Sequence, residues 1–410
     1  MSALPASVVV QKFGGTSVAT AEGRDALRAR VSDTRATGDA VVVIVSAMGR
    51  SGAPYATDTL LSLLDGHDVV PREADMLAAC GEVISAVVVA HELRSAGVPA
   101  IALTGAEAGV ITDGVFRDAA VLDVDTTAIS AALADGLVPV ITGFQGVTAS
   151  GETTTLGRGG SDTSACAIAA ALGASAVEIY TDVDGVMTAD PRACDAVRVL
   201  DALQYEELFQ MAKAGSKVMH APAAEAAMAA GVPVWVRNTY SPARGTIIAD
   251  AARIAAESRP RVATAVSHVD GIARIMVRMS HENDPGARMR AITRVFRSMA
   301  DAGVSLDMFT PCGTVLVLSF ADGLLADAIR VLDAIGLPYD VEIGLAKVTL
   351  VGAGMHGVPG VMARVAEALA GAGVDILQIA DSHYTISVLV RQEVRRTTIG
   401  ALHEAFELGS

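Results

Sequence analysis

The stretch from Val8 to Ser17 constrains the fold most, because it reads as a buried strand followed by a glycine turn. Three consecutive valines are typical of a strand covered on both faces, as in a parallel sheet with helices on each side. Similar strand-then-glycine units recur at 40–52, 98–105 and 138–146, with helical stretches at about 20–37 and 71–95 between them. The alternation predicts an α/β fold with a mainly parallel sheet, in which ligands bind at the carboxyl ends of the strands.

The turn after the first strand carries a cation. Lys12 stands at the carboxyl end of the strand, and Gly14 and Gly15 predict a tight turn with exposed N–H groups. Thr16 and Ser17 are good N-caps for a helix that starts near Thr20. A lysine, a glycine turn and a helix N-terminus indicate a phosphate site. The alternative is an ordinary strand-to-helix turn with a solvated lysine.

Composition limits the class of protein. The chain has 410 residues, 51% of them hydrophobic, which predicts two or three domains with large cores. A net charge of −15 argues against nucleic acid as a partner. The four cysteines (Cys80, Cys166, Cys194 and Cys312) are scattered, as expected of reduced thiols in the cytoplasm. We expect no signal peptide and no membrane-spanning segment, because no apolar run approaches the required length.

A second glycine-rich stretch, 153–164, combines opposite charges. Arg158 can bind a carboxylate or phosphate with two hydrogen bonds, and Asp162 can accept from an ammonium group. These are the groups that an α-amino acid requires of a pocket. The alternative is a capped helix start with a local Arg158–Asp162 ion pair. Glu82 lies among apolar residues, in a helix that we expect to be interrupted at 80–82. It lies either at the edge of a pocket or on the wet face of this helix.

The loop from Tyr180 to Arg192 is rich in aspartate. Asp182 and Asp184 suggest a metal, but a calcium loop would need a glutamate at its last position, which this loop lacks. Lys217 supplies another cation farther on. His220 could be catalytic, but a histidine before an alanine-rich helix is more often structural.

The C-terminal part of the chain repeats itself. Arg294-Val295 with Ala302-Gly303-Val304 recurs seventy residues later as Arg364-Val365 with Ala372-Gly373-Val374. Each copy predicts an apolar helix, a strand, a small polar loop and a second strand, so the repeat indicates two similar modules. Gly352, Gly354 and Gly357 match a dinucleotide-binding pattern, but too few residues follow for such a sheet. These glycines predict a small-ligand turn or an interface turn instead.

With these motifs in hand, the chain resembles the aspartate kinases of the amino-acid kinase family over residues 8–408. The motifs that carry the resemblance are 12–17, 80–82, 143–146, 156–164, 180–192 and 215–220. The repeat resembles the paired ACT domains of these enzymes, which bind end-product amino acids. Residues 378–383 are most similar to the diaminopimelate-sensitive Bacillus-type subgroup.

The resemblance implies an αβα sandwich with a mainly parallel sheet, followed by two ferredoxin-like ACT domains. Its expected boundaries are 1–245 for the catalytic domain, 246–262 for a linker, and 263–340 and 341–410 for two ACT domains that can be intertwined. It implies transfer of phosphate from ATP, with Mg²⁺, to the side-chain carboxylate of L-aspartate. It also implies regulation by lysine, threonine or diaminopimelate, a cytoplasmic location and a homodimer formed through the ACT domains.

The resemblance also implies roles for single residues. It makes Lys12 and Asp182 catalytic, and gives no residue as a metal ligand. Aspartate would be held by Ser46, Thr57, Glu82, Arg158, Gly159 and Asp162. The nucleotide would be held by Gly14, Gly15, Thr181, Asp182, Met187, Asp190, Arg192 and Lys217. The effector would be held by Asp307, Gln378, Asp381, Ser382 and His383.

The chain departs from the family pattern at two places. Ala221-Pro222 stands where the family has Pro-Arg after the histidine, and Met187 stands where many members have a tyrosine near the adenine. Both departures concern nucleotide affinity. The alternatives are another amino-acid kinase and a catalytically silent amino-acid sensor; intact Lys12, Asp182 and Lys217 weigh against the sensor.

Overall fold

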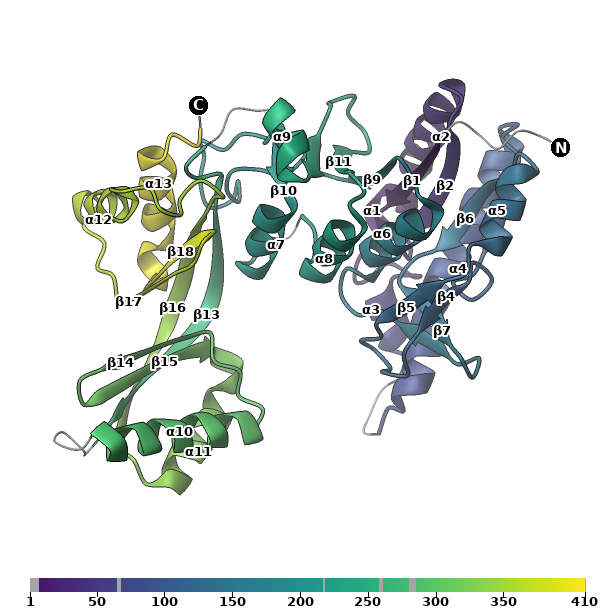
Figure 1. Cartoon of the computed structure of the whole chain (residues 1–410). Helices are drawn as coiled ribbons and strands as arrows, with labels where there is room; N and C mark the ends of the chain where they lie inside the picture. The colour runs from purple at the N-terminus through teal and green to yellow at the C-terminus, as the bar shows by residue number, and fades with distance from the viewer. Residues whose placement is uncertain (1–6, 65–67, 217, 258–260, 280–284, 410) are drawn as a thin grey trace. The chain divides into compact units, whose positions relative to one another are not determined.

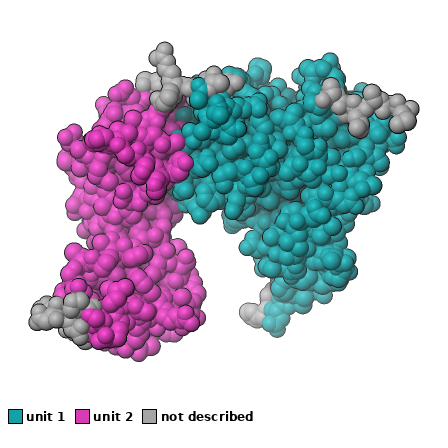
Figure 2. Space-filling model, in the orientation of Figure 1, with its two compact units in different colours: residues 1–187, 199–260 teal, residues 188–198, 261–410 magenta. Residues whose placement is uncertain are grey.

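The chain forms two compact units. The computed structural model describes residues 7–64, 68–216, 218–257, 261–279 and 285–409. Unit 1 comprises residues 1–187 and 199–260, and unit 2 comprises residues 188–198 and 261–410 (Figure 2).

Within the described residues, unit 1 is built on an eight-stranded sheet with the order β10-β12-β11-β9-β1-β2-β6-β3 (Figure 1). Neighbouring strands are parallel except for β11 and β12, which confirms the predicted mainly parallel sheet. Its strands are β1 (Val8–Phe13), β2 (Ala40–Val45), β3 (Ala100–Leu103), β6 (Val138–Thr142), β9 (Ala176–Thr181), β10 (Ala202–Gln204), β11 (Val234–Asn238) and β12 (Thr246–Ala249).

A smaller sheet and a set of helices complete unit 1 as far as the structure describes it. The small sheet has the order β5-β4-β7-β8, formed by β4 (Val110–Thr112), β5 (Val121–Val124), β7 (Gln145–Thr148) and β8 (Thr153–Thr155). The helices are α1 (Gly15–Ala19), α2 (Ala21–Ala36), α3 (Thr57–Leu61), α4 (Pro71–Ser95), α5 (Thr127–Ala134), α6 (Gly160–Leu172), α7 (Tyr205–Lys213), α8 (Ala221–Ala230) and α9 (Ala251–Glu257).

The two faces of β1 contact different helices. Gln11 donates a hydrogen bond to Thr34 of α2 (2.8 Å), and Phe13 belongs to an apolar core with residues of α2 and α4. Side chains alternate along a strand, so Lys12 between them points to the opposite face. There its Nζ lies 2.6 Å from Asp162 of α6. The alternation of side chains along β1 therefore places Phe13 in the apolar core and Lys12 on the opposite face, next to Asp162.

Two local predictions in unit 1 were wrong. Thr16 and Ser17 lie inside α1, and Thr20 caps α2 by accepting from the N–H of Gly23. The helix predicted to be interrupted at 80–82 is continuous as α4.

By length and composition α4 could also cross a bilayer, with a mean hydropathy of 1.6 over an 18-residue window. Half of this window is buried, as in a core helix of a water-soluble fold.

The predicted linker is also partly wrong. Thr246–Ala249 forms β12, a fully buried strand between β10 and β11. Thr246 donates to the carbonyl of Leu200 (2.6 Å) and accepts from the N–H of Val186 (2.9 Å). Four residues are too short for a clear strand pattern, and it is pairing with strands on both sides that makes this segment part of the core.

Unit 2 contains, in its described part, a six-stranded antiparallel sheet with the order β14-β15-β13-β16-β18-β17. The strands are β13 (Ala265–Arg278), β14 (Met308–Cys312), β15 (Val315–Ala321), β16 (Tyr339–Val351), β17 (Gln378–Asp381) and β18 (Thr385–Arg391). The helices are α10 (Pro285–Asp301), α11 (Leu325–Ile335), α12 (Val361–Gly371) and α13 (Arg395–Ala405), with short 3₁₀ turns at Asp322–Leu324 and Gln392–Val394.

The seventy-residue repeat is visible in unit 2. The hairpin β14–β15 corresponds to the hairpin β17–β18. The long strands β13 and β16 pair along their whole length, so that each carries residues of both copies. Residues 188–198 also belong to unit 2, where Ala189, Ala193 and Cys194 join the core beneath α12 and α13. Gly352 and Gly354 pack on the backbone of 261–263, where a Cβ atom would lie 2.5 Å from the Val262 oxygen and 2.3 Å from the Arg261 oxygen respectively.

A substitution tests the place of β12 in the sheet. Thr246→Val leaves the buried N–H of Val186 and carbonyl of Leu200 without their shared partner. We expect unit 1 to lose about 1–3 kcal/mol of stability, measured by calorimetry as a lower melting temperature. The exposed Thr37→Val serves as the control. Equal melting temperatures for the two variants would contradict this assignment.

Candidate active site

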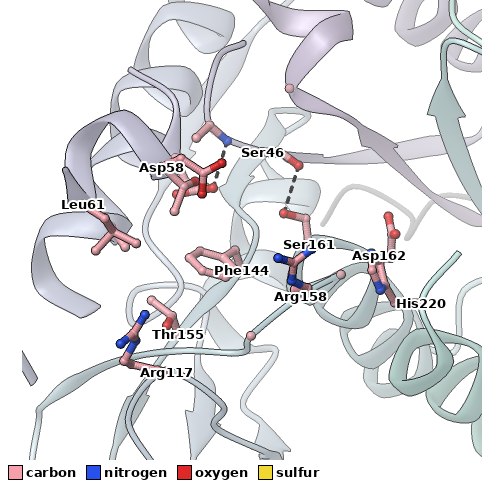
Figure 3. Close-up of a pocket in the computed structure, with 18 of the residues that line it drawn as sticks. Ser46, Asp58, Leu61, Arg117, Phe144, Thr155, Arg158, Ser161, Asp162 and His220 are labelled. Atoms are coloured by element: carbon pink, nitrogen blue, oxygen red, sulfur yellow. Dashed lines mark hydrogen bonds between the residues drawn. The ribbon is translucent and has the colours of Figure 1, made fainter. Parts of the chain in front are cut away.

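A cavity of about 640 Å³ opens in unit 1 where β1, β2, β6 and β9 end (Figure 3). Parallel strands bring their carboxyl ends to one edge of the sheet, which is why loops distant in sequence meet here. The cavity wall includes these residues predicted from the sequence: Lys12, Gly15, Ser46, Thr57, Glu82, Arg158, Gly159, Asp162 and Thr181.

The cavity contains a nearly buried ion pair. Lys12 Nζ and Asp162 Oδ1 lie 2.6 Å apart, and the two side chains are 11% and 9% exposed. The sequence left open a local ion pair between Arg158 and Asp162, but Asp162 pairs with Lys12 instead. The Arg158 guanidinium makes no hydrogen bond or ion pair to any residue in the described ranges. It lines the cavity as an available cation.

Glu82 lies in the cavity wall and not on a wet helix face. It is 2% exposed, and its Oε1 accepts a hydrogen bond from the Ala47 N–H (2.9 Å). Its Oε2 has no hydrogen-bond partner among the described residues. Burial raises the pKa of Glu82 from 4.5 to about 8, and the hydrogen bond from Ala47 opposes this only in part. Glu82 is therefore largely protonated at pH 7 in the free protein.

Two glycines permit close approach of the loops. A Cβ atom on Gly15 would lie 2.5 Å from the Ala47 oxygen and 2.7 Å from the Gly49 oxygen. Gly159 has a φ of +75°, and a Cβ atom there would lie 2.4 Å from Cβ of His220. His220 thus lines the cavity next to the Arg158 loop. The prediction that the turn exposes its N–H groups is wrong for Gly14, which donates to the Tyr180 carbonyl (3.2 Å).

Several predicted nucleotide residues lie outside the cavity wall. Asp182 is exposed and pairs with Arg50 (2.6 Å), which follows β2. Met187 pairs with Val199 in an isolated bridge. Asp190 and Arg192 belong to unit 2 and pair with each other (2.8 Å), and this hydrogen bonding lowers the pKa of Asp190 to about 2. Lys217 lies outside the described residues.

Sequence reasoning missed part of the wall. Ser161 accepts a hydrogen bond from Ser46 (3.0 Å), and Phe144 follows β6 (Figure 3). Asp75 and Arg117 also line the cavity. Asp75 precedes Glu82 by seven residues, or about two helical turns, so helical spacing could have found it. Nothing in the local sequence marks Arg117.

The predicted effector residues lie at the edges of the sheet in unit 2. Gln378 is buried, accepts from Ser319 (2.5 Å) and donates to Thr310 (3.0 Å). Asp307 pairs with Lys347 (2.7 Å). Asp381 and Ser382 are exposed at the end of β17, and the His383 ring lies 4.1 Å from the ring of His356.

Comparisons with known proteins extend over the whole chain. Residues 7–238 match the amino acid kinase family, and residues 340–404 match the ACT domain. Aspartokinase 1 of Bacillus subtilis is 42% identical over 405 residues, covering 98% of this chain and 99% of the relative. The chain belongs to the aspartokinase family. Aspartokinase of Mycobacterium tuberculosis is 40% identical over 420 residues, covering 98% of this chain and 97% of the relative.

Solved aspartokinases have the same fold. Escherichia coli aspartokinase III, solved with aspartate and ADP, is 25% identical with a TM-score of 0.77 and covers 98% of this chain and 100% of that one. Clostridium acetobutylicum aspartate kinase, at 21% identity, has a TM-score of 0.78 and covers 97% of this chain and 100% of that one. The predicted kinase family and ACT region are therefore confirmed, and the chain is an ATP-dependent aspartokinase.

The buried Glu82 of this aspartokinase predicts a pH dependence. From about pH 4.5 to 8 the folded chain holds a proton that the unfolded chain has lost, so this residue lowers the free energy of unfolding as the pH rises. Glu82→Gln should be more stable than the parent at pH 8, by an amount on the order of a few kcal/mol, with little difference near pH 4.5. Thermal melts across this range measure the difference.

The exposed Glu73 of the same helix is the matched control, because Glu73→Gln removes a carboxylate that stands in water. Its melting temperature should follow that of the parent at every pH. If the melting temperature of Glu82→Gln also follows that of the parent at every pH, the buried carboxyl group does not carry the expected proton.

Proposed function

We propose that the chain transfers phosphate from ATP to the side-chain carboxylate of L-aspartate, forming 4-phospho-L-aspartate and ADP in the cytoplasm. One observation carries this proposal: Lys12, paired with Asp162, shares a cavity with the buried Glu82 and with Arg158, which has no partner among the described residues. Such a cavity suits a molecule that carries both an ammonium group and carboxylates. The ligands of the Escherichia coli relative, aspartate and ADP, fit the same assignment.

The ammonium group of aspartate would be held by acidic side chains. Asp162 and Glu82 both line the cavity, and Glu82 Oε2 is unsatisfied among the described residues. A nearby positive charge favours the ionised form of a carboxyl group. We therefore expect Glu82 to lose its proton when aspartate binds. Arg158 would bind the α-carboxylate, and Ser46, Thr57 and Gly159 would complete this end of the site.

The reaction needs charge neutralisation more than a base. The side-chain carboxylate of aspartate has a pKa of about 3.9 and is ionised at pH 7, so it attacks without losing a proton. The obstacle is repulsion between this anion and the triphosphate. Lys12 is the cation placed to reduce it, with Gly14 and Gly15 beside the phosphates. Lys12 would contact the transferring phosphoryl group while Asp162 turns to the substrate.

The rest of the nucleotide site rests on the family resemblance. We assign to it Thr181, Asp182, Met187 and Lys217. The described residues contain no cluster of three His, Cys, Asp or Glu side chains that could hold a metal ion. The residues present therefore fit a Mg²⁺ ion that arrives mainly on phosphate oxygens. Such an ion supplies further neutralisation of the phosphate charge.

A lysine substitution tests the reaction. Lys12→Ala should lower kcat for aspartate-dependent ADP release by about a hundredfold or more, because it removes a preorganised charge from the site. Lys213→Ala, at an exposed position whose ammonium lies over the Phe209 ring, should keep parental turnover. A coupled ADP assay measures both. Near-normal turnover by Lys12→Ala would refute the role of Lys12, and no aspartate-dependent ADP from the parent would refute the activity.

Regulation would act through unit 2, where the chain matches the ACT domain. An amino-acid effector bound there would bias the kinase between two states. We propose lysine, threonine or diaminopimelate, bound through Asp307, Gln378, Asp381, Ser382 and His383. The edge strands β14 and β17 expose Phe309 and Ile379, which supports a homodimer formed along these edges.

An exposed carboxylate in unit 2 tests this regulation. Asp381→Ala removes an acceptor for an effector ammonium group, and we expect about a tenfold higher effector concentration for half-inhibition. The kcat without effector should not change. Glu404→Ala, which removes an exposed carboxylate of α13, is the control. Inhibition curves with lysine, threonine and diaminopimelate give the measurement, and an unchanged curve for Asp381→Ala would place the effector elsewhere.

A further inference from the structure

Arg117 is a third cation in the cavity wall, after Lys12 and Arg158, and the proposed chemistry has not used it. It lies in the loop between β4 and β5, and its side chain is exposed at the cavity. Its guanidinium makes no hydrogen bond or ion pair with any residue that the structure describes. An available guanidinium in a substrate cavity is a binding group for an anion.

The backbone of Arg117 is held in an unusual conformation. Its backbone φ is +73°, a value that residues other than glycine and asparagine rarely adopt. Asp75, which is 1% exposed, accepts a hydrogen bond from the Arg117 N–H (3.0 Å). The same carboxylate accepts from the Thr155 N–H and hydroxyl, both at 2.8 Å. The buried carboxylate of α4 thus ties the Arg117 loop to β8.

The loop of Arg117 also packs on the loop of Arg158. A Cβ atom on Gly157 would lie 2.6 Å from Asp118 Oδ1 and 3.3 Å from the Arg117 oxygen. Two arginines on adjoining loops therefore line one cavity, and neither has a partner among the described side chains. A carboxylate has two oxygens, which can accept from both guanidinium groups.

The position of Arg117 decides which carboxylate it can reach. In Figure 3, Arg117 and Thr155 lie on one side of the cavity, and Asp162 and His220 lie on the other, with Phe144 between them. Lys12 pairs with Asp162 on that other side. Arg158 lies next to Ser161, on the Asp162 side of Phe144. The carboxylate that reacts must lie near Lys12, so the carboxylate that does not react can lie between Arg158 and Arg117.

We propose that Arg117 is a specificity-determining residue that binds, together with Arg158, the α-carboxylate of the amino-acid substrate. This inference rests on the proposed function. Asp75 acts through Arg117 as a positioning residue, because its hydrogen bond holds the loop in the conformation that presents the guanidinium. The cavity then selects aspartate by two arginines that bind the α-carboxylate and by Lys12 near the carboxylate that reacts.

Substitution of Arg117 tests the inference in the full chain. Arg117→Ala should raise KM for aspartate about tenfold, with kcat and KM for ATP unchanged, since the lost contact is made equally in the bound and transition states. Arg117→Lys should recover part of the loss. Arg28→Ala removes a half-buried cation, paired with Asp25, that lies outside the cavity wall and should leave KM unchanged.

Binding measurements identify the group that Arg117 contacts. Calorimetric titration with aspartate and with its α-amide, without ATP, compares ligands that differ only at the α-carboxylate. Arg117→Ala should weaken aspartate about tenfold and the amide less than twofold. If Arg117→Ala binds aspartate with an affinity within twofold of the parent, the inference is overturned. An equal loss of affinity for aspartate and for its α-amide overturns it too.

A glycine variant separates binding from backbone structure. Arg117→Gly removes the side chain and relieves the left-handed strain, so it should keep the parental melting temperature and still bind aspartate weakly. Parental affinity in Arg117→Gly would mean that the alanine variant fails through its backbone, which overturns the inference. No aspartate turnover by the parent would instead overturn the proposed function. Parental kinetics in an active Arg117→Ala would overturn only the role of Arg117.

Discussion

The ion pair between Lys12 and Asp162 is the interaction on which the site depends. Each side chain is about one-tenth exposed, so removal of either partner would leave an uncompensated charge in a poorly solvated place. The strand supplies Lys12, and the first turn of α6 supplies Asp162. Both elements must be packed together before the pair forms. Charge at this edge of the sheet is thus maintained by the same packing that forms the core of unit 1.

The long helix α4 supplies two buried carboxyl groups to the cavity wall. Asp75 and Glu82 lie on one face of it and both are buried, but their surroundings differ. Asp75 accepts hydrogen bonds from Arg117 and Thr155 and so positions a loop. Glu82 accepts one hydrogen bond, from Ala47, and its pKa rises to about 8. Two carboxyl groups two helical turns apart therefore differ: Asp75 holds a loop by hydrogen bonds, and burial raises the pKa of Glu82.

Unit 2 shows how a sequence repeat becomes a single sheet. The matching hairpins β14–β15 and β17–β18 lie at its two ends, and β13 and β16 run through both copies. Because the central strands are shared, the two copies cannot separate without loss of pairing along both strands. A ligand that alters one edge of this sheet therefore acts on a continuous structure, as regulation by an amino-acid effector requires.

The parallel α/β sheet, the repeat and most of the charged cavity residues could be predicted from the amino-acid sequence alone. Those features are local: a valine run with a glycine turn specifies Lys12, and the glycines around Arg158 place Asp162 in the first turn of a helix. Four features depend on tertiary packing: Asp162 pairs with Lys12, 246–249 is a buried strand, 188–198 joins unit 2, and Asp75 holds the Arg117 loop. Each of these depends on segments distant in the chain meeting in space. Local spacing does not encode such a meeting, because it is set by which faces the packed core buries.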